Sequence, residues 1–380
     1  MQTAQVKDIN ANEVILAVSI ELSSKSWKLA LHDGCREKAA IYTVKDETPH
    51  KRLRSTIAVI KRQIEKWALP TYVSVAVVYE AGQDGFWISR ALSARGYAVK
   101  VVDPASIPVE RRARRAKTDR LDSIKLVLAL RAWLRGEHDR MHVIKVPDKA
   151  AEAHRHMMRE RGTLQKERQQ HRDRIRKLLR TVGCWEAVDS GFTERLEAGQ
   201  VKCYSGAVLP DELYRRIKRE LNRLALVDEH LGELEQTLLE HLPDAQRKHI
   251  QHLRLLKGVG AVGSIRLVLE LFWRDFKNRR QVGSCVGLVP QPYDSGESRV
   301  DQGISKQGNR RVRALLIEMA WMWLRYQPTS VISVWFNQRT QGANKRSKRI
   351  AIVAVARRLV IALWRYLKDG VIPEGAQLKA

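Results

Sequence analysis

The sequence has few cysteines, and they form no recognised metal-binding or disulfide pattern. They are Cys35, Cys184, Cys203 and Cys285, and no two of them make a C-x-x-C pair. Such scattering suggests neither a zinc site nor a disulfide framework. With 380 residues and an apolar content of 44%, the chain can bury a sizeable core without either. We therefore expect two or three domains in a reducing compartment.

A long apolar run is also missing. No segment approaches the roughly 20 apolar residues of a membrane-spanning helix. The first residues, MQTAQVKDIN, lack the basic and apolar blocks of a signal peptide. We therefore expect a cytoplasmic protein without a membrane partner.

Acidic residues are scarce relative to basic ones. The chain has 42 Asp and Glu against 69 Lys and Arg, a formal net charge of +27. A field of this sign favours polyanions over small neutral substrates. Nucleic acid is therefore the expected partner.

The first 135 residues alternate short β-branched runs with amphipathic stretches. Periodicity predicts strands over 14–20, 27–33, 39–45, 72–79 and 97–103, and helices over 50–67 and 85–96. Three hairpin-connected strands followed by alternating helices and strands are typical of an α/β domain of the RuvC or ribonuclease-H-like type. We assign this domain to residues 1–146.

Two long helices are expected next, over 147–182 and 211–242. The second carries apolar residues at alternating spacings of three and four, namely Leu224, Val227, Leu231, Leu234 and Leu238. This spacing is compatible with a coiled-coil arm over 147–245 that pairs within the chain or with another subunit. An ordinary helical hairpin packed on its own chain explains the pattern equally well.

The remaining residues, 246–380, predict a mostly helical domain. The segment LRLLKGVGAVGSIRLVLEL reads as a helix, a turn at 258–260 and a second helix, a helix-hairpin-helix-like element whose turn amides can face a phosphate. A glycine-rich segment covers 283–309. Two apolar helices follow over 310–326 and 345–367, each opened by a basic cluster.

Four acids of the first domain stand where a sheet can collect them. Glu21 and Glu80 end predicted strands, while Asp119 and Asp122 lie three apart at the start of a helix. Closely spaced carboxylates supply the oxygen ligands that divalent cations such as Mg²⁺ prefer. Each acid alone is also compatible with a solvated charge, and the two aspartates with a capped, Arg-paired helix start.

Basic clusters flank these elements and the glycine-rich segment. Such residues neutralise phosphates and position a nucleic acid without reading its sequence. Tryptophans within the apolar helices, by contrast, are expected in the core. The candidate nucleic-acid-binding residues are Arg111, Arg112, Arg114, Arg115, Lys117, Lys306, Arg310, Arg311, Arg313, Lys345, Arg346, Lys348 and Arg349.

Several motifs together resemble one known family. They are VSIELSSK with VVYEAGQDGFW, then AKTDRLDS, and finally KGVGAVG, VGLVPQPYDSG and GISKQGNRRVR. In order and spacing the chain resembles, along nearly its whole length, the insertion-sequence transposases of the one-hundred-and-ten family. These are bridge-RNA-guided recombinases with a RuvC-like DEDD domain, a coiled-coil arm and a C-terminal transposase domain.

The resemblance implies roles for particular residues. Glu21, Glu80, Asp119 and Asp122 correspond to the DEDD acids that hold magnesium, with Glu21 in place of the usual Asp. Ser295 corresponds to a nucleophile that forms a covalent phosphoserine link with DNA. The resemblance also implies a structured noncoding guide RNA, target and donor double-stranded DNA, a homodimer or homotetramer, and association with the bacterial nucleoid.

Physical chemistry leaves alternatives for Ser295. A serine hydroxyl needs a base or a metal to become a nucleophile, and no histidine lies in its segment. Asp-Ser-Gly is also an ordinary turn sequence. A metal-dependent nuclease of the Holliday-junction-resolvase type needs no serine, and a basic architectural protein needs neither serine nor carboxylates.

Overall fold

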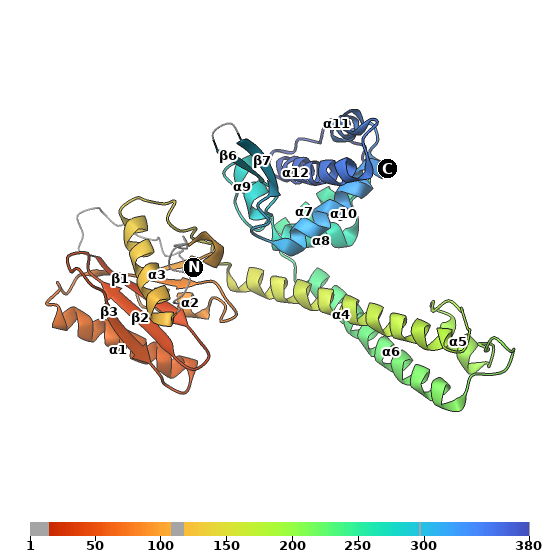
Figure 1. Ribbon diagram of the computed structural model, residues 1–380, viewed down its shortest axis with the longest axis horizontal. Coiled ribbons are helices and arrows are strands. Elements are labelled where there is room, and N and C mark those ends of the chain that lie inside the picture. The colour runs from red at the N-terminus through yellow and green to blue at the C-terminus, as the bar shows by residue number, and fades with distance from the viewer. Residues whose placement is uncertain (1–14, 108–117, 296–297, 380) are drawn as a thin grey trace. The chain divides into compact units, whose positions relative to one another are not determined.

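The structure is a computed structural model that describes residues 15–107, 118–295 and 298–379. The chain divides into two compact units, Met1–Pro147 and Asp148–Ala380 (Figure 1). The predicted division of the second unit at residue 245 stays a prediction. None of the described helices is long and apolar enough to span a membrane.

A five-stranded mixed sheet forms the centre of the first unit (Figure 1). The strand order is β3-β2-β1-β4-β5, with antiparallel pairing among the first three strands and parallel pairing of β1 with β4 and of β4 with β5. This sheet is consistent with the ribonuclease-H-like domain predicted from the sequence. The strands are β1 Ile15–Leu22, β2 Trp27–His32, β3 Ala40–Val44, β4 Ser74–Glu80 and β5 Ala98–Val102.

Helices cover both faces of this sheet. The α-helices are α1 Pro49–Lys66, α2 Trp87–Ser93 and α3 Asp119–Leu134, and a short 3₁₀ turn, η1, spans Pro104–Ser106. Leu53 and Ile88, from α1 and α2, share one apolar core with β-strand residues such as Val77. Leu126 of α3 belongs to a second core with Val78 on the opposite face. Neighbouring strand residues therefore point into different layers, as the period of two requires.

The second unit begins with two long paired helices, α4 Lys149–Arg180 and α6 Asp211–Glu240, which we call the helical arm. Ion pairs join Arg161 to Glu235 and Arg168 to Asp228, so the numbering runs in opposite directions and the helices are antiparallel. The connection between them carries α5, Phe192–Glu197, at one end of the pair (Figure 1). The two helices predicted from the sequence are present, and the coiled-coil interpretation of the arm stays a prediction.

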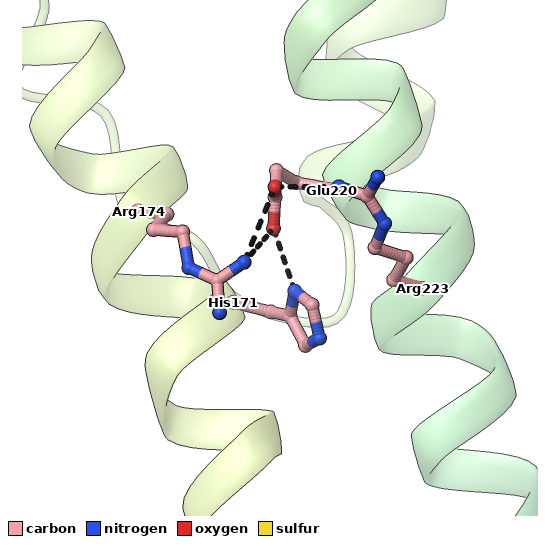
Figure 2. A network of polar contacts seen from close by, with 4 residues as sticks. All are labelled: His171, Arg174, Glu220 and Arg223. Carbon is pink, nitrogen blue, oxygen red and sulfur yellow. Dashed lines mark hydrogen bonds and ion pairs between the residues drawn. The ribbon is translucent and has the colours of Figure 1, made fainter.

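One buried carboxylate links the two arm helices (Figure 2). Glu220 of α6 has a side chain only 9% exposed. It lies 2.6 Å from His171 Nδ1 across the interface and accepts hydrogen bonds from Arg174 and, within α6, Arg223. Burial opposes ionisation, but the His171 hydrogen bond and the arginine charges outweigh it and hold the pKa of Glu220 below its ordinary value.

The rest of the second unit is a helical core with one hairpin. Its helices are α7 Asp244–Leu255, α8 Ala261–Glu270, α9 Arg279–Cys285, α10 Arg310–Tyr326, α11 Val331–Thr340 and α12 Lys345–Asp369. Met158 and Leu238 from the helical arm join this core, so arm and core are continuous. Residues 256–260 connect α7 to α8, as the sequence predicted for two helices and a glycine turn; the helix-hairpin-helix interpretation stays a prediction.

The glycine-rich segment contains an antiparallel hairpin that the sequence analysis did not predict. It consists of β6 Pro290–Ser295 and β7 Ser298–Ile304. Two prolines in β6 hid the strand, because proline cannot donate to a ladder and is rare inside sheets. A two-stranded ribbon tolerates them, since each strand has one unpaired edge.

Candidate active site

Two of the candidate acids lie at one edge of the first unit's sheet. Glu21 is the next-to-last residue of β1, and Glu80 is the last residue of β4. These strands are parallel neighbours whose register pairs Ile20 with Tyr79. The next residue of each strand is an acid, so Glu21 and Glu80 come level at the carboxyl ends of adjacent strands. Both side chains are half-buried.

The acidic start of α3 is tied to the same face of the sheet. Side chains alternate along a strand, so Ser19 and Glu21 point to one face of β1. On that face the Ser19 hydroxyl donates a 2.6 Å hydrogen bond to the carbonyl of Ser123. Asp122 and Asp119 precede Ser123 by one and four residues in α3. The bond therefore anchors the turn carrying both aspartates to the strand that ends near Glu21.

The local sequence explains why α3 begins where it does. Thr118 is the N-cap, and its side chain accepts a 3.3 Å hydrogen bond from the Leu121 amide. Asp119 is exposed and Asp122 half-buried. Negative charge in a first turn is favourable against the helix dipole. Stabilising the helix start and binding a cation are thus both open to these two residues.

A fifth acid, Asp103, lies at this edge and was not singled out from the sequence. Strand β5 ends at Val102, which pairs with Glu80, and Asp103 follows directly. The Asp103 amide donates a 3.0 Å hydrogen bond to the carbonyl of His142. Its signal in the sequence is the one used for Glu80, an acid that directly follows an apolar strand.

The donor set at this edge has the chemistry of a divalent-cation site. Carboxylate oxygens at adjacent strand ends are the ligands that Mg²⁺ prefers. Glu21 and Glu80 each have a polar partner within the chain. Across residues 15–107, 118–295 and 298–379, no three Asp, Glu, His or Cys side chains are grouped so as to hold a metal ion.

Ser295 is the last residue of β6, in the second unit. The register of the hairpin pairs Ser295 with Ser298, the first residue of β7. The serine therefore stands at the end of a β-ribbon whose register shifts between Pro290 and Pro292. Strand pairing fixes the backbone on its N-terminal side, which limits the positions that Ser295 can take relative to the helical core.

Two tight backbone contacts lock the base of this hairpin. Gly287 has φ of +65°, and a Cβ added there would come within 2.0 Å of the Gln307 carbonyl oxygen. A Cβ on Gly308, with φ of +78°, would lie 2.2 Å from the carbonyl oxygen of Cys285. Only glycine fits such positions. The two motifs before and after the hairpin are thus packed against each other through glycine.

The residues that follow hold this junction to α8 and α10. Asn309 caps α10 by accepting hydrogen bonds from the Arg311 and Val312 amides, and its side chain donates to Glu270 at 3.3 Å. Arg313 is buried and donates to the carbonyls of Val286 and Gln307. Burial, and then the charge of Arg310, lowers the pKa of Arg313. Several residues of the motif GISKQGNRRVR thus connect the base of the hairpin to α8, α9 and α10.

The candidate nucleic-acid-binding residues differ in whether their side chains are exposed or are engaged in hydrogen bonds within the protein. Arg313 is engaged as just described, and Arg311 donates to the carbonyls of Met158 and Arg159 in α4. Lys306 and Arg310 are exposed, and Lys306 has an unusual φ of +56°. Exposed basic side chains also open α12, namely Lys345, Arg346, Lys348 and Arg349. The basic run Arg111, Arg112, Arg114, Arg115 and Lys117 lies outside the described residues.

Comparisons with known proteins identify the class of this fold and site. Residues 42–183 match the family model for DEDD transposases of the IS110 type, described as a transposase. Residues 250–331 match the model described as the transposase IS116/IS110/IS902 family. The first match contains the sheet edge with Glu80 and the start of α3, and the second contains the hairpin with Ser295.

One relative covers nearly the whole chain, and others cover parts of it. The transposase-named protein y4rJ of Sinorhizobium fredii (strain NBRC 101917 / NGR234) is 39% identical over 379 residues, 95% of this chain and 94% of its own. The transposase for insertion sequence element IS1111A of Coxiella burnetii is 30% identical over 40% of this chain and 42% of its own. The transposase for insertion sequence element IS1328 of Yersinia enterocolitica is 27% identical over 43% of this chain and 48% of its own.

The chain belongs to the IS110 family of transposases. It is therefore an enzyme that acts on DNA in the transposition of an insertion sequence. A DEDD transposase domain also implies dependence on a divalent cation in general.

Proposed function

We propose that this transposase is a site-specific recombinase that cuts and rejoins DNA through a covalent phosphoserine at Ser295. The observation that supports it is the placement of Ser295 at the end of a strand whose base is locked by Gly287 and Gly308. A nucleophile must be held close to one phosphorus atom, and a rigid mount lowers the cost of doing so. A covalent intermediate also conserves the bond energy that rejoining needs.

The chemistry assigned to Ser295 balances as a transesterification. The serine hydroxyl loses its proton as Oγ forms a bond to phosphorus, the bond from phosphorus to one bridging oxygen of the strand breaks, and that oxygen takes up one proton, so no net proton is gained or lost. Rejoining reverses the step when a strand hydroxyl attacks the phosphoserine. Nothing is oxidised or reduced, and no other reactant is consumed.

We assign the metal-binding role to Glu21, Glu80, Asp119 and Asp122. The strand-end pairing of Glu21 with Glu80 and the anchoring of α3 by Ser19 support this assignment. Mg²⁺ bound there would stabilise charge on phosphate oxygens. Asp103, which directly follows the neighbouring strand β5, is a further candidate to bind the cation or to orient one of these acids. The proposal requires the acids and Ser295 to assemble on one DNA, within a chain or between subunits of a homodimer or homotetramer.

We further propose that a structured noncoding RNA guides the enzyme to its target and donor DNA. The net charge of +27 and the exposed cluster at the start of α12 supply contacts to phosphate backbones. Backbone contacts carry no sequence information. A guide that pairs with DNA would supply the sequence reading that such a surface lacks. The family resemblance is the second support for this step.

Substitution of the serine tests the chemistry. Ser295→Ala should abolish recombination and remove a denaturant-stable DNA adduct that the unchanged protein forms on a suicide substrate. Ser298→Ala, its hairpin partner, is the matched control and should keep both. Cleavage that persists in Ser295→Ala, with no adduct in the unchanged protein, would instead indicate metal-dependent hydrolysis of the resolvase type.

The guide is tested separately. The protein is expressed with the noncoding DNA that flanks its gene, purified, and its bound RNA is sequenced. A single defined RNA that is required for DNA cleavage supports guidance. Recombination by RNA-free protein on the same DNA would disprove it without affecting the role of Ser295.

A further inference from the structure

Two large aromatic side chains are almost fully exposed at the end of the helical arm. Residues 181–210, which connect α4 to α6 and which we call the arm tip, include Trp185 and Tyr204, at 77% and 86% exposure. Aromatic rings bury much area when they have a partner, so two of them left largely in water on one short segment are candidates for contact with a ligand.

The arm tip that carries them is rigid. Its own apolar core includes Cys184, Val188 and Phe192, packed against the last turns of α4 and the first turns of α6. The Tyr204 amide donates a 3.0 Å hydrogen bond to the carbonyl of Val182. Gly183, at φ +69°, allows this approach, since a Cβ there would lie 2.7 Å from the Cβ of Tyr204. The exposed rings are thus presented by a folded scaffold.

A cavity of about 310 Å³ adjoins Trp185, and its lining combines both charges. Arg176 and Arg180 contribute from α4, and Glu186 and Asp189 contribute from the arm tip. The guanidinium carbon of Arg180 lies 4.7 Å from the centre of the Trp185 ring, so a cation covers part of the indole. Volume, aromatic wall and polar rim together match a small planar group better than a helix or strand.

The two carboxylates are held in place but keep acceptor capacity. Arg195 Nε donates 2.8 Å to Glu186 Oε1, and an Nη2 of Arg195 lies 3.0 Å from Asp189 Oδ1. A carboxylate accepts about four hydrogen bonds in total, so the second oxygens can accept from a ligand. Amino groups of nucleobases are donors of the required kind.

We propose that the arm tip binds an unpaired nucleotide of a single-stranded nucleic acid. The base stacks on Trp185, its amino group donates to Glu186 or Asp189, and the neighbouring phosphate pairs with Arg180; Arg176 already forms an ion pair with Asp173. Tyr204 offers a second ring to the adjoining base. Stacking suits single strands because every base presents a π face, whereas paired bases of a duplex are already stacked. A protein partner would be served by the rings alone, whereas a ligand that carries a phosphate also uses the charge of Arg180 beside Trp185.

This inference is independent of the cleavage chemistry assigned to Ser295. It adds a contact site to the nucleic-acid binding proposed above, and single-stranded RNA and single-stranded DNA share its chemistry. The experiment therefore uses no cleavage. Fluorescence anisotropy of labelled oligonucleotides measures binding to the full-length protein, with excess unlabelled duplex DNA present to occupy duplex sites.

Trp185→Ala should weaken binding of the preferred single strand by about 5- to 150-fold, the range expected for loss of one stacked base. Trp185→Phe should restore part of it. Tyr72→Ala is the matched control, because Tyr72 is 82% exposed on the other unit, and it should leave binding unchanged. Arg180→Gln should reduce the slope of log affinity against log salt by about 0.7, as for one lost phosphate contact.

Photocrosslinking locates the contact directly. A single strand carrying 4-thiouridine or 4-thiothymidine should crosslink to the arm tip, and Ser295→Ala should crosslink equally. Comparing the RNA and DNA strands shows which one is the ligand. Equal binding by Trp185→Ala and the unchanged protein, with crosslinks only elsewhere, would overturn the proposal. The proposal would also be overturned if Trp185→Ala changed the oligomeric state of the protein and left its oligonucleotide affinity unchanged, because the rings would then contact a second copy of the chain.

Discussion

The hydroxyl of Ser19 in β1 donates a 2.6 Å hydrogen bond to the backbone carbonyl of Ser123 in α3, and both groups are buried. This bond crosses 104 positions of sequence and joins the strand that ends near Glu21 to the helix that begins with Asp119 and Asp122. The position of Asp119 and Asp122 relative to Glu21 therefore depends on the Ser19–Ser123 hydrogen bond, although neither serine is a candidate metal ligand.

Ser19→Ala is expected to lower cation affinity and DNA cleavage more than it lowers stability. A lost hydrogen bond with its carbonyl left unsatisfied costs about 1–3 kcal/mol, while a small shift of α3 would misplace two carboxylates. Cation binding by calorimetry and thermal unfolding of the same sample measure the two effects. Ser23→Ala is the control, since the Ser23 hydroxyl donates to the Ser26 carbonyl within a local, part-buried turn. Equal losses in both variants would contradict this.

Asp119→Asn and Asp122→Asn separate the two roles open to these residues. Each should cost about 0.3–1 kcal/mol through the helix dipole and, if they bind the cation, should also abolish cleavage. Asp211→Asn provides the matched control because Asp211 occupies the first turn of α6. It should show the dipole cost alone. Full DNA cleavage by both α3 variants would remove the metal-binding role and leave an acidic helix cap.

Glu220→Gln should weaken the pairing of α4 with α6. Hydrogen bonds to charged groups contribute about 1.5–3 kcal/mol when buried. The hydrogen bond with His171 contributes most of the stabilisation by Glu220, because Arg174 and Arg223 are half exposed. Hydrogen exchange of the arm amides measures the loss without assuming two-state unfolding of a two-unit chain. Arg223→Gln should cost less than about 1 kcal/mol.

The same carboxylate makes the arm sensitive to acid. The folded pKa of Glu220 lies below the ordinary value of 4.5. Its contribution is therefore fully present above that pH and is lost as the pH falls through the folded pKa. Exchange protection in the arm of the unchanged protein should fall below about pH 4.5. In Glu220→Gln it should not show this step, and an identical pH profile in both proteins would contradict the assignment.

Much of the fold was predictable because local patterns carry it. The apolar run VSVAVVYE predicts a buried strand that ends at an acid. The two arm helices are predicted by apolar residues that recur every three or four positions. The hairpin β6–β7 was missed because the prolines of β6 argue against a strand, and the short helices α9 and α11 have too few turns to show periodicity. Among the tryptophans expected in the core, Trp323 is fully buried but Trp321 is 46% exposed.

The positions of the candidate acids along their strands and helix were predictable from the sequence, but the contacts that join these elements were not. Glu80 follows an apolar strand and could be found from that alone, and Asp103 carries the same signal yet was overlooked. The tie between Ser19 and Ser123 leaves no mark in the sequence, because buried serines look like exposed ones. Trp185 and Tyr204 lie in a connection without periodicity, so only the exposure in the folded chain distinguishes them.

The glycines at the base of the hairpin give the sharpest test of the mount proposed for Ser295. The alanine in Gly308→Ala must adopt a positive φ, which destabilises the fold by about 1–2 kcal/mol. It must also displace the carbonyl oxygen of Cys285, which would lie 2.2 Å from the new Cβ. Gly342→Ala has a φ of +69° with open space around it, so it shows the first cost only. We expect Gly308→Ala to lose the DNA adduct at Ser295 and to melt at a lower temperature than Gly342→Ala, which keeps the adduct. Adduct formation by Gly308→Ala at the unchanged rate would show that the nucleophile needs no rigid base.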